Sequence, residues 1–471
     1  MSYPLEPSPE DMREMGEAAL GFVVDFLRGL PDTPASDYDG AEEFRRGFRE
    51  DVPLDGVRFE AALDTVRRAT AKGVNTAGPG FLGYIPGGGL FAASLADLLA
   101  NTINRFVNLW YTAPAAAQIE WNVVRWMCDL FGYPAEARGV LTSGGSMANF
   151  SAIVTARRAL LPEDFLAGTM YVSDQAHASL SKAAALAGFP PRNVRIVPSS
   201  EDLHLDVDAL RVAVEADRRD GLRPFLVVAS AGTTNTGAVD PIAELLTFAR
   251  VQGLWLHVDG AYGGFFQLTD RGRALFEGIG EADSITLDPH KGMFLPYGTG
   301  CLLVRDGARL REAHFVSQDY LQDLAPEAEV PNFAEYSPEL SRDFRGLRVW
   351  LPLKLHGLEA FRGALDEKLD LARYLHDALT ETPGLTLPWR PELTVVPFWL
   401  QPPGASPDET NALNRRLLER INASRRVFMS STLVRGRFVI RPCIVVHRTH
   451  RDRIDEAIDV TRKAVADLTG S

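Results

Sequence analysis

The sequence contains very few cysteines. Only three occur among 471 residues, at Cys128, Cys301 and Cys443. They are far apart, odd in number and not at metal-ligand spacing, so they indicate neither a disulfide framework nor a zinc site. Isolated cysteines of this kind are typical of buried thiols in a reducing compartment. We therefore expect a cytoplasmic protein that holds no metal.

An excess of positive charge and long apolar runs are also missing. The net charge is −13, whereas a nucleic-acid binder would show a basic face, so no nucleic-acid partner is expected. No stretch approaches ~18 uninterrupted apolar residues, so we expect no membrane-spanning helix. Residues 1–16 contain acids and prolines without an apolar core, which does not fit a signal peptide.

The N-terminal region, residues 1–80, is expected to be helical. The pattern predicts a helix over 8–30 with Ser8 as its cap, an extended connector over 31–55 and a second helix near 57–72. These helices have too few apolar residues to fold alone. We expect them to pack on another lobe or another subunit.

The central region, residues 81–350, alternates short apolar runs rich in β-branched residues with helical stretches. The runs expected to be strands are RGVLT, TMYVS, NVRIVP, FLVVAS, LWLHVD, SITLD and GCLLVR. This alternation predicts an α/β domain with a mainly parallel central sheet. In such sheets, ligands bind at the carboxyl ends of the strands.

The C-terminal region, residues 351–471, reads as a smaller α+β domain. A long helical stretch leads into it, which the sequence predicts to be broken or kinked at Pro352. Two strand-like runs, VFMSSTLV and RFVIRPCIV, and helices over 408–423 and 451–468 follow.

Two of the predicted strands end in residues suited to binding an anion or to proton transfer. The first runs into Ser143-Gly144-Gly145-Ser146 and then a helix, where free backbone N–H groups and two hydroxyls can hold a phosphate. The second is followed by His177. An ordinary capped turn and a structural histidine are the alternative explanations.

Two further strands end in charged residues. Asp259 follows a very apolar run, and a carboxylate there needs a partner. Lys291, in DPHKG, can act as an amine nucleophile if it lies in a cleft. A helix cap and a lysine with its ammonium group in solvent are the ordinary explanations.

Together, in this order on one sheet, the four features match the requirements of pyridoxal 5′-phosphate (PLP). A lysine forms a Schiff base with the cofactor, a carboxylate keeps the pyridine nitrogen protonated and an imidazole stacks on the ring. The glycine- and serine-containing turn would hold the phosphate.

The chain resembles the fold-type I (aspartate aminotransferase-like) PLP-dependent amino-acid decarboxylases of the group that contains aromatic-L-amino-acid decarboxylase and glutamate decarboxylase. The resemblance covers nearly the whole chain and is most specific in TSGGSMAN, SDQAHASLSKAA, HVDGAYGG and DPHKG. It implies α-decarboxylation of an L-amino acid to the amine and CO₂.

The resemblance also implies a role for each matching residue. Lys291 would carry the cofactor, Asp259 would pair with its pyridine nitrogen, and His177 would stack on the ring as the catalytic histidine. The other implied cofactor contacts are Gly144, Gly145, Ser146, Thr233, Ala261, Asp288 and His290. Tyr320, in a predicted mobile loop, would return a proton to Cα.

The substrate pocket of the family matches Tyr84, Ile85 and Phe106 in this chain. These residues favour an aromatic or bulky apolar substrate, although Arg105 leaves an acidic one open. Asp288 departs from the asparagine of the aromatic and glutamate enzymes, and an acid near a phosphate is unfavourable unless it is paired. The family further implies a homodimer with the active site at the subunit interface.

Several alternatives remain at the level of sequence. A decarboxylating aldehyde synthase uses the same cofactor but replaces the loop tyrosine or the stacking histidine, and this chain has both Tyr320 and His177. An aminotransferase and a binding protein without activity are further alternatives. GPGFLG at 78–83 matches the G-x-G-x-x-G pattern of a dinucleotide-binding oxidoreductase, but no apolar strand precedes it.

Overall fold

The computed structural model describes residues 5–85, 87–316 and 331–470. Its largest element is a seven-stranded sheet in the order β4-β10-β9-β8-β7-β5-β6. The strands are β4 (Arg138–Thr142), β5 (Gly168–Ser173), β6 (Val194–Val197), β7 (Arg223–Ser230), β8 (Trp255–Gly260), β9 (Ser284–Leu287) and β10 (Gly300–Val304). Only β10 runs antiparallel to its neighbours. All seven predicted runs are therefore strands of one sheet, and the mainly parallel α/β architecture is confirmed.

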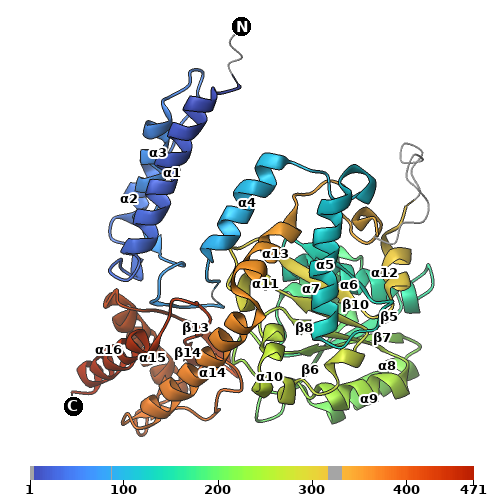
Figure 1. The fold of residues 1–471 in the computed structure, drawn as a ribbon. Coiled ribbons are helices and arrows are strands. Elements are labelled where there is room, and N and C mark those ends of the chain that lie inside the picture. The colour runs from blue at the N-terminus through green and yellow to red at the C-terminus, as the bar shows by residue number, and fades with distance from the viewer. Residues whose placement is uncertain (1–4, 86, 317–330, 471) are drawn as a thin grey trace.

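Helices cover both faces of this sheet (Figure 1). Alternate residues of β7 show why: Val227 and Ala229 belong to one buried cluster, whereas Leu226 and Val228 belong to another. Because successive side chains of a strand point to opposite faces, the two clusters lie on opposite sides of the sheet. The helices of this domain are α4 (Phe91–Ile103), α5 (Pro114–Leu130), α6 (Gly145–Leu160), α7 (Ser179–Leu186), α8 (Val207–Arg219), α9 (Ile242–Gln252), α10 (Asp270–Leu275), α11 (Pro289–Gly292), α12 (Gly307–His314) and α13 (Arg345–His356).

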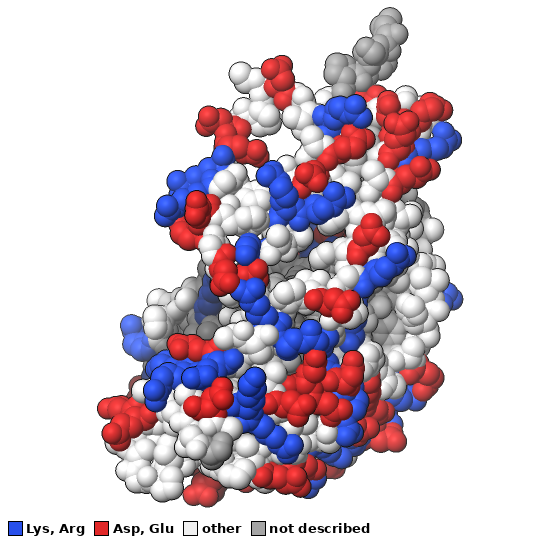
Figure 2. Space-filling model, turned by 90° about the vertical axis from the view of Figure 1, so that its left-hand side faces the viewer, with Lys and Arg blue, Asp and Glu red and all other residues white. Residues whose placement is uncertain are grey.

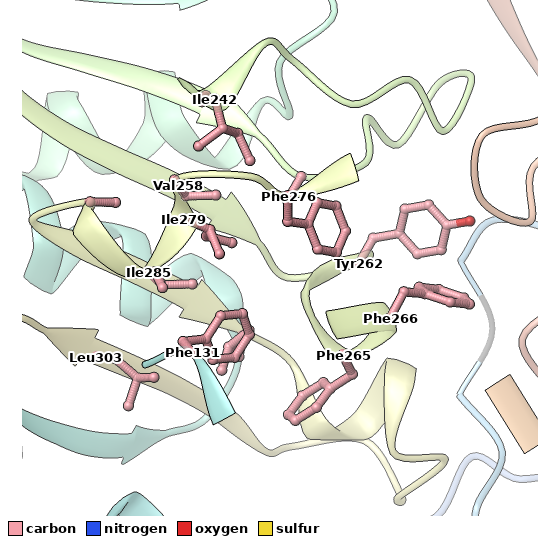
Figure 3. Packing of buried hydrophobic residues seen from close by; sticks show 14 of the residues in the cluster. Phe131, Ile242, Val258, Tyr262, Phe265, Phe266, Phe276, Ile279, Ile285 and Leu303 are labelled. Carbon is pink, nitrogen blue, oxygen red and sulfur yellow. The ribbon is translucent and has the colours of Figure 1, made fainter. Parts of the chain in front are cut away.

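The larger cluster is rich in aromatic side chains. Figure 3 shows Phe131, Phe265, Phe266 and Phe276 packed beside the strands that lead to the candidate site. Each of these four side chains is at most 2% exposed. A close-packed core of this kind fixes the strand ends to which the functional residues are attached.

The C-terminal region forms a smaller α+β unit. Its elements are α14 (Leu358–Thr380), β11 (Leu385–Thr386), β12 (Trp399–Leu400), α15 (Pro407–Ala423), β13 (Phe428–Val434), β14 (Arg437–Arg441) and α16 (Arg451–Thr469). A three-stranded sheet joins β14, β13 and β3 (Phe81–Leu82), so residues from the start of the central region pair with the C-terminal strands.

The sequence predicted a break or a kink at Pro352, and the break is wrong. Pro352 lies inside α13, and the chain turns instead at Gly357, whose φ is +72°. This backbone conformation is easily adopted only by glycine, so Gly357 separates α13 from α14. A proline in the last turns of a helix removes one hydrogen bond but does not have to end the helix.

The N-terminal region forms a helical pair that projects from the body (Figure 1). Ser8 and Asp11 form a capping box at the start of α1 (Pro9–Gly29), as the sequence predicted, and α3 (Phe59–Ala69) packs beside α1. Neither helix contains a buried residue. The connector is not wholly extended, because it contains α2 (Ala41–Arg46), in which Glu42 pairs with Arg45. It also contains β1 (Ser36–Asp37), which pairs with β2 (Gly73–Val74).

The structure also bears on two classes of function considered above. The GPGFLG segment does not form a strand–turn–helix unit, because β3 lies within it and no helix follows directly. A Cβ at Gly80 would lie 2.4 Å from the carbonyl oxygen of Arg426. Its glycines therefore allow close packing, and the dinucleotide alternative is wrong. Basic and acidic side chains are interspersed on the face in Figure 2. No helix within the described ranges is both long and apolar enough to cross a membrane.

Candidate active site

One cavity of about 270 Å³ lies at the carboxyl ends of the central strands. Its wall contains all ten residues that the sequence suggested for cofactor binding: Gly144, Gly145, Ser146, His177, Thr233, Asp259, Ala261, Asp288, His290 and Lys291. They come from five separate stretches of the chain. The parallel strands bring them together because their carboxyl ends meet at the same edge of the sheet.

Lys291 lies in the single turn α11, directly after β9. Its ammonium group is 2.8 Å from Oδ2 of Asp288, whose side chain is only 3% exposed. The neighbouring His290 donates from Nδ1 to the carbonyl oxygen of Thr299 at 2.7 Å. Burial lowers the pKa of His290, and its Nε2 lies 3.6 Å from Oδ2 of Asp288.

Asp259 lies near the end of β8 and is held by two donors. Nδ2 of Asn149 donates to Oδ2 at 2.9 Å, and the backbone N–H of Ala261 donates to Oδ1 at 3.1 Å. Each carboxylate oxygen can accept more than one hydrogen bond, so Asp259 keeps acceptor capacity toward the cavity.

His177 precedes α7 and contacts Ser179 through its Nδ1 atom. The backbone N–H of Ser179 donates to this nitrogen at 3.2 Å, and Oγ of Ser179 lies 2.8 Å from it. A backbone N–H can only donate, so Nδ1 carries a lone pair and the hydrogen of the neutral ring is on Nε2.

The turn between β4 and α6 has the shape of an anion site. Gly144 has a φ of +155°, which residues with a Cβ rarely adopt. A Cβ built on Gly145 would lie 3.0 Å from both the Cβ of Ala261 and Oδ2 of Asp288. The first N–H groups of α6 have no acceptor within the helix. The turn therefore offers free N–H groups to a phosphate, and any side chain at Gly145 would occupy the space.

The remaining wall leaves room for a flat ring. Ala261 provides only a methyl group beside Asp259, and Thr233 is fixed by its N–H bond to the carbonyl oxygen of Ala238 at 2.8 Å. An amine, a carboxylate, an imidazole and a backbone cradle thus surround one space. This set of groups fits PLP.

The structure does not bring the three suggested substrate residues to the cavity wall. Ile85 is packed in the large apolar cluster, whereas Tyr84 is exposed with its ring near that of Phe428. Phe106 is partly exposed after α4. Tyr320 lies outside the described residues.

Several cavity residues were not identified from the sequence. They are Met147, Asn149, Ser179, Ser230, Gly232, Thr234 and Tyr262. Asn149 could have been predicted from the sequence, because it lies four residues after Gly145 and therefore on the same face of α6. His257, which contacts Asn149 behind the wall, had another, because it lies two residues before Asp259 on the same face of β8.

Comparison with known proteins agrees with this geometry. The chain is 35% identical over 452 residues to the aromatic-L-amino-acid decarboxylase of Bacillus atrophaeus, covering 95% of this chain and 94% of that protein. It is 28% identical to the phenylacetaldehyde synthase of Arabidopsis thaliana, covering 98% and 96% of the two chains. The structure of TDC from Oryza sativa with PLP and tryptamine superposes with a TM-score of 0.94 at 26% identity, covering 99% and 100%.

The sequence model of one family matches most of the chain. Described as the pyridoxal-dependent decarboxylase conserved domain, it covers residues 42–401. The PLP cofactor expected from the four strand ends is thereby confirmed, as are the fold-type I architecture and the enzyme class that the resemblance implied. This chain belongs to the pyridoxal-dependent decarboxylase family, and it is a PLP-dependent amino-acid decarboxylase.

Proposed function

We propose that this enzyme removes the α-carboxylate of an aromatic L-amino acid and releases the corresponding amine and CO₂. The observation that carries the proposal is the convergence of Lys291, Asp259 and His177 on one cavity. The aromatic preference is supported by the names of the relatives above, which include an aromatic-L-amino-acid decarboxylase and a structure holding tryptamine.

Each cavity residue has its own role toward the cofactor. When bound, PLP supplies the electron sink that accepts the electron pair of the Cα–carboxylate bond. Lys291 provides the amine that would hold the cofactor. Asp259 provides a negative charge for the pyridine nitrogen, and the free N–H groups of the Gly144–Ser146 turn bind the phosphate, with His290 in the adjoining wall. Thr233 and Ala261 limit where the ring can lie.

His177 lines the cavity and is exposed to solvent. An imidazole there can cover one face of the ring and present its Nε2–H toward the substrate. Tyr320, following the family resemblance, would return a proton to Cα after CO₂ has left. A tyrosine hydroxyl can perform this step as a general acid.

We also propose a homodimer in which the partner subunit completes the substrate pocket. The apolar residues Leu98, Leu99 and Ile103 of α4 are each more than half exposed, as is Tyr111. The α1–α3 pair adds further uncovered apolar side chains and projects from the body (Figure 1). Large apolar side chains left exposed on neighbouring elements support an interface between proteins.

A shared pocket would explain the positions of the predicted substrate residues. Tyr84 adopts a φ of +53°, an unfavourable value for a residue with a side chain, and its N–H is held by Oγ of Ser430 at 2.8 Å. Backbone strain of about 1–3 kcal/mol is retained mainly at functional sites. Tyr84, Ile85 and Phe106 would then shape the pocket together with residues from across the interface.

Subunit complementation tests the shared site. Lys291→Ala and Phe106→Ala variants are each expected to have little activity as homodimers. Mixing them under conditions that allow subunit exchange should restore activity if the two residues serve one site from different chains. Sedimentation of the wild-type protein as a monomer that is fully active would contradict the proposal.

A decarboxylating aldehyde synthase is the second candidate, since one relative carries that name. The presence of both His177 and Tyr320 favours simple decarboxylation. We expect purified enzyme with PLP to convert tryptophan, tyrosine, phenylalanine, dopa or 5-hydroxytryptophan into one dominant amine, detected by mass spectrometry. Aldehyde and ammonia as main products would support the synthase instead, and turnover by Lys291→Ala would contradict the site.

The cytoplasmic location remains a proposal. It is supported by the three cysteines, which are all buried and unpaired in the structure. Burial raises the pKa of Cys128 to about 12 and that of Cys443 to about 11, so these thiols are unreactive.

A further inference from the structure

A row of hydrogen-bonded side chains lies behind the wall of the cavity. Nε1 of Trp255 is 2.8 Å from Oγ of Ser284, and the same oxygen is 2.8 Å from Nδ1 of His257. Nε2 of His257 is 3.0 Å from Oδ1 of Asn149. Ser284 and His257 are completely buried, and Asn149 is 1% exposed. The row therefore runs through the protein interior between β8, β9 and α6.

At Asn149 the row divides into two branches that both reach the cavity. One hydrogen of its Nδ2 is donated to Oδ2 of Asp259 at 2.9 Å. The same nitrogen lies 3.1 Å from Oγ of Ser179, which in turn lies 2.8 Å from Nδ1 of His177. The side-chain amide of Asn149 thus contacts the carboxylate of Asp259 directly and the imidazole of His177 through the hydroxyl of Ser179.

The donor and acceptor of each hydrogen bond between Trp255 and Asp259 follow from the chemistry of the groups. A carboxylate only accepts, so the nitrogen of Asn149 must face Asp259 and its oxygen must face His257. That oxygen also only accepts, so His257 carries its hydrogen on Nε2 and a lone pair on Nδ1. Ser284 then donates its hydroxyl hydrogen to His257 and accepts from the indole N–H of Trp255.

Complete burial keeps His257 neutral. It lowers the pKa of His257 to about 4, against the attraction of Asp259, which acts in the opposite direction. The Nε2 atom also lies 3.3 Å from Oγ1 of Thr286, a second acceptor for its hydrogen. His257 therefore meets Asn149 as a neutral donor rather than as a cation.

The branch through Ser179 fixes the ring of His177. Oγ of Ser179 accepts from Asn149 and can donate its own hydrogen to Nδ1 of His177, where the backbone N–H of Ser179 also points. Both hydrogens converge on the lone pair of this nitrogen. His177 is consequently held as the tautomer that has its hydrogen on Nε2.

We propose that Asn149 and His257 are positioning residues that hold Asp259 and His177 in one fixed arrangement: Asp259 as an oriented acceptor and His177 as an Nε2–H donor. The inference rests on the proposed roles of those two residues toward PLP. Asn149 also separates the imidazole of His257 from the carboxylate of Asp259. Because an amide does not titrate, it prevents a direct exchange of a proton between the two, and Asp259 keeps its charge for the cofactor.

Asn149→Asp tests the branch point with little change in shape. The new carboxylate can still accept from His257, but it loses both donors and places an oxygen against Oδ2 of Asp259. We expect the dissociation constant of PLP to rise at least tenfold and the visible circular dichroism of the bound cofactor to change. The absorbance of the bound cofactor should also acquire a new pH dependence, because the two carboxylates must share a proton. kcat should fall more than KM rises.

A pair of variants tests the hydrogen bond that Nε2 of His257 donates to Oδ1 of Asn149. His257→Leu removes the N–H that Asn149 accepts, whereas the amide of His257→Gln can again donate to Asn149 and accept from Ser284. We expect His257→Leu to alter the circular dichroism and weaken PLP binding at least fivefold, and His257→Gln to recover most of that loss. Thermal unfolding of the apo forms monitors folding separately.

The outcomes separate this inference from the proposed function. If the wild-type enzyme forms an amine but Asn149→Asp and His257→Leu leave PLP affinity, circular dichroism and kcat unchanged, the positioning role is overturned and the function stands. If His257→Gln is as impaired as His257→Leu, the donated hydrogen is not what matters, and the inference is again overturned. If wild-type enzyme binds PLP but no aromatic amino acid is decarboxylated, the proposed function fails, whereas the binding and dichroism tests still decide the positioning role.

Discussion

The ammonium group of Lys291 lies 2.8 Å from the carboxylate of Asp288, three residues earlier in the chain. The second oxygen of this carboxylate is buried and makes no hydrogen bond within the described part of the chain. The carboxylate also faces the turn at Gly145, where we place the phosphate. An acid therefore lies beside an expected anion, and the amine that balances it is the one that must bind the cofactor.

Asp288→Asn should consequently bind PLP more tightly. Removing the negative charge removes its repulsion of the phosphate and frees the amine of Lys291 from an ion pair. We expect the dissociation constant to fall about tenfold, which corresponds to about 1.4 kcal/mol. Titration of the apo enzyme with PLP, followed by absorbance, measures this directly. Weaker binding by Asp288→Asn would instead show that the carboxylate helps to hold the cofactor.

Asp259→Asn should reduce catalysis without preventing cofactor binding. The amide can still accept from Asn149 or Ala261, but it provides no negative charge for the pyridine nitrogen. Removing one preorganised electrostatic partner typically costs about 10²–10³-fold in kcat. Steady-state kinetics at saturating PLP give the value. A kcat close to that of the wild type would exclude the assigned role.

The position of the site could be predicted from the sequence because it depends on a simple rule. Lys291, Asp259, His177 and the Gly144–Ser146 turn all follow apolar runs, and parallel strands place such ends at one edge of the sheet. The seven runs were recognisable because they are short and apolar and each contains at least one β-branched residue. The site therefore follows from local patterns and one topological rule.

The contacts behind the wall could not be predicted in this way. Asn149 and His257 are 108 residues apart, and their contact depends on how α6 lies across β8. The position of the break after α13 was missed for a related reason, since Gly357 rather than Pro352 adopts the required backbone angle. Helix packing and the choice between two breaking residues are decided by tertiary structure, not by local propensity.

Gly292→Ala should destabilise the fold. A Cβ built at Gly292 would lie 2.7 Å from the Cβ of Phe265, which is 1% exposed and packed in the core shown in Figure 3. Overpacking of this kind costs about 1–3 kcal/mol in the free energy of unfolding. Urea denaturation measures the change.

Gly363→Ala provides the matched control for that substitution. Gly363 lies within α14 with no atom within 4 Å of a built Cβ, so alanine should stabilise the helix by about 0.5–1 kcal/mol. Equal effects of the two substitutions would contradict the proposed role of the Phe265 contact.

Glu120→Gln should be among the most destabilising single changes. Glu120 of α5 pairs with Arg342, and both side chains are completely buried. Its other oxygen accepts from the backbone N–H of Gly346 in α13 at 2.9 Å. Glutamine leaves the charge of Arg342 uncompensated, which costs about 3–5 kcal/mol at a buried site.

The exposed pair between Asp64 and Arg67 offers a comparison. Its side chains are 61% and 57% exposed, so Asp64→Asn should change the free energy of unfolding by no more than about 1 kcal/mol. Urea denaturation of both variants gives the two values. A small loss in Glu120→Gln would mean that Arg342 finds another partner or is reached by solvent.

His314 should contribute to acid destabilisation. Burial lowers its pKa from 6.5 to about 4, and its Nε2 has no hydrogen-bond partner in the ranges that the structure covers. Between these two pH values the unfolded chain binds a proton that the folded chain does not. The stabilising contribution is therefore complete above pH 6.5 and is lost as the pH falls toward 4, by up to about 1.4 kcal/mol per pH unit.

Other buried groups also change how the free energy of unfolding depends on pH, but they do not alter the expected effect of His314→Gln. His257 and His447, with pKa values lowered to about 4 and about 3, act in the same direction. Asp240 acts in the opposite direction, because burial raises its pKa to about 6 and its contribution is lost as the pH rises. Between pH 6.5 and 4, the unfolded wild-type chain binds a proton at His314 that the folded chain does not. His314→Gln should remove this difference in the number of bound protons. The free-energy gap between this variant and the wild type, measured by urea denaturation at pH 7.5, 6 and 5, should therefore shift in favour of the variant as the pH falls. A gap that is constant over this range would show that His314 has the same pKa in the folded and the unfolded protein.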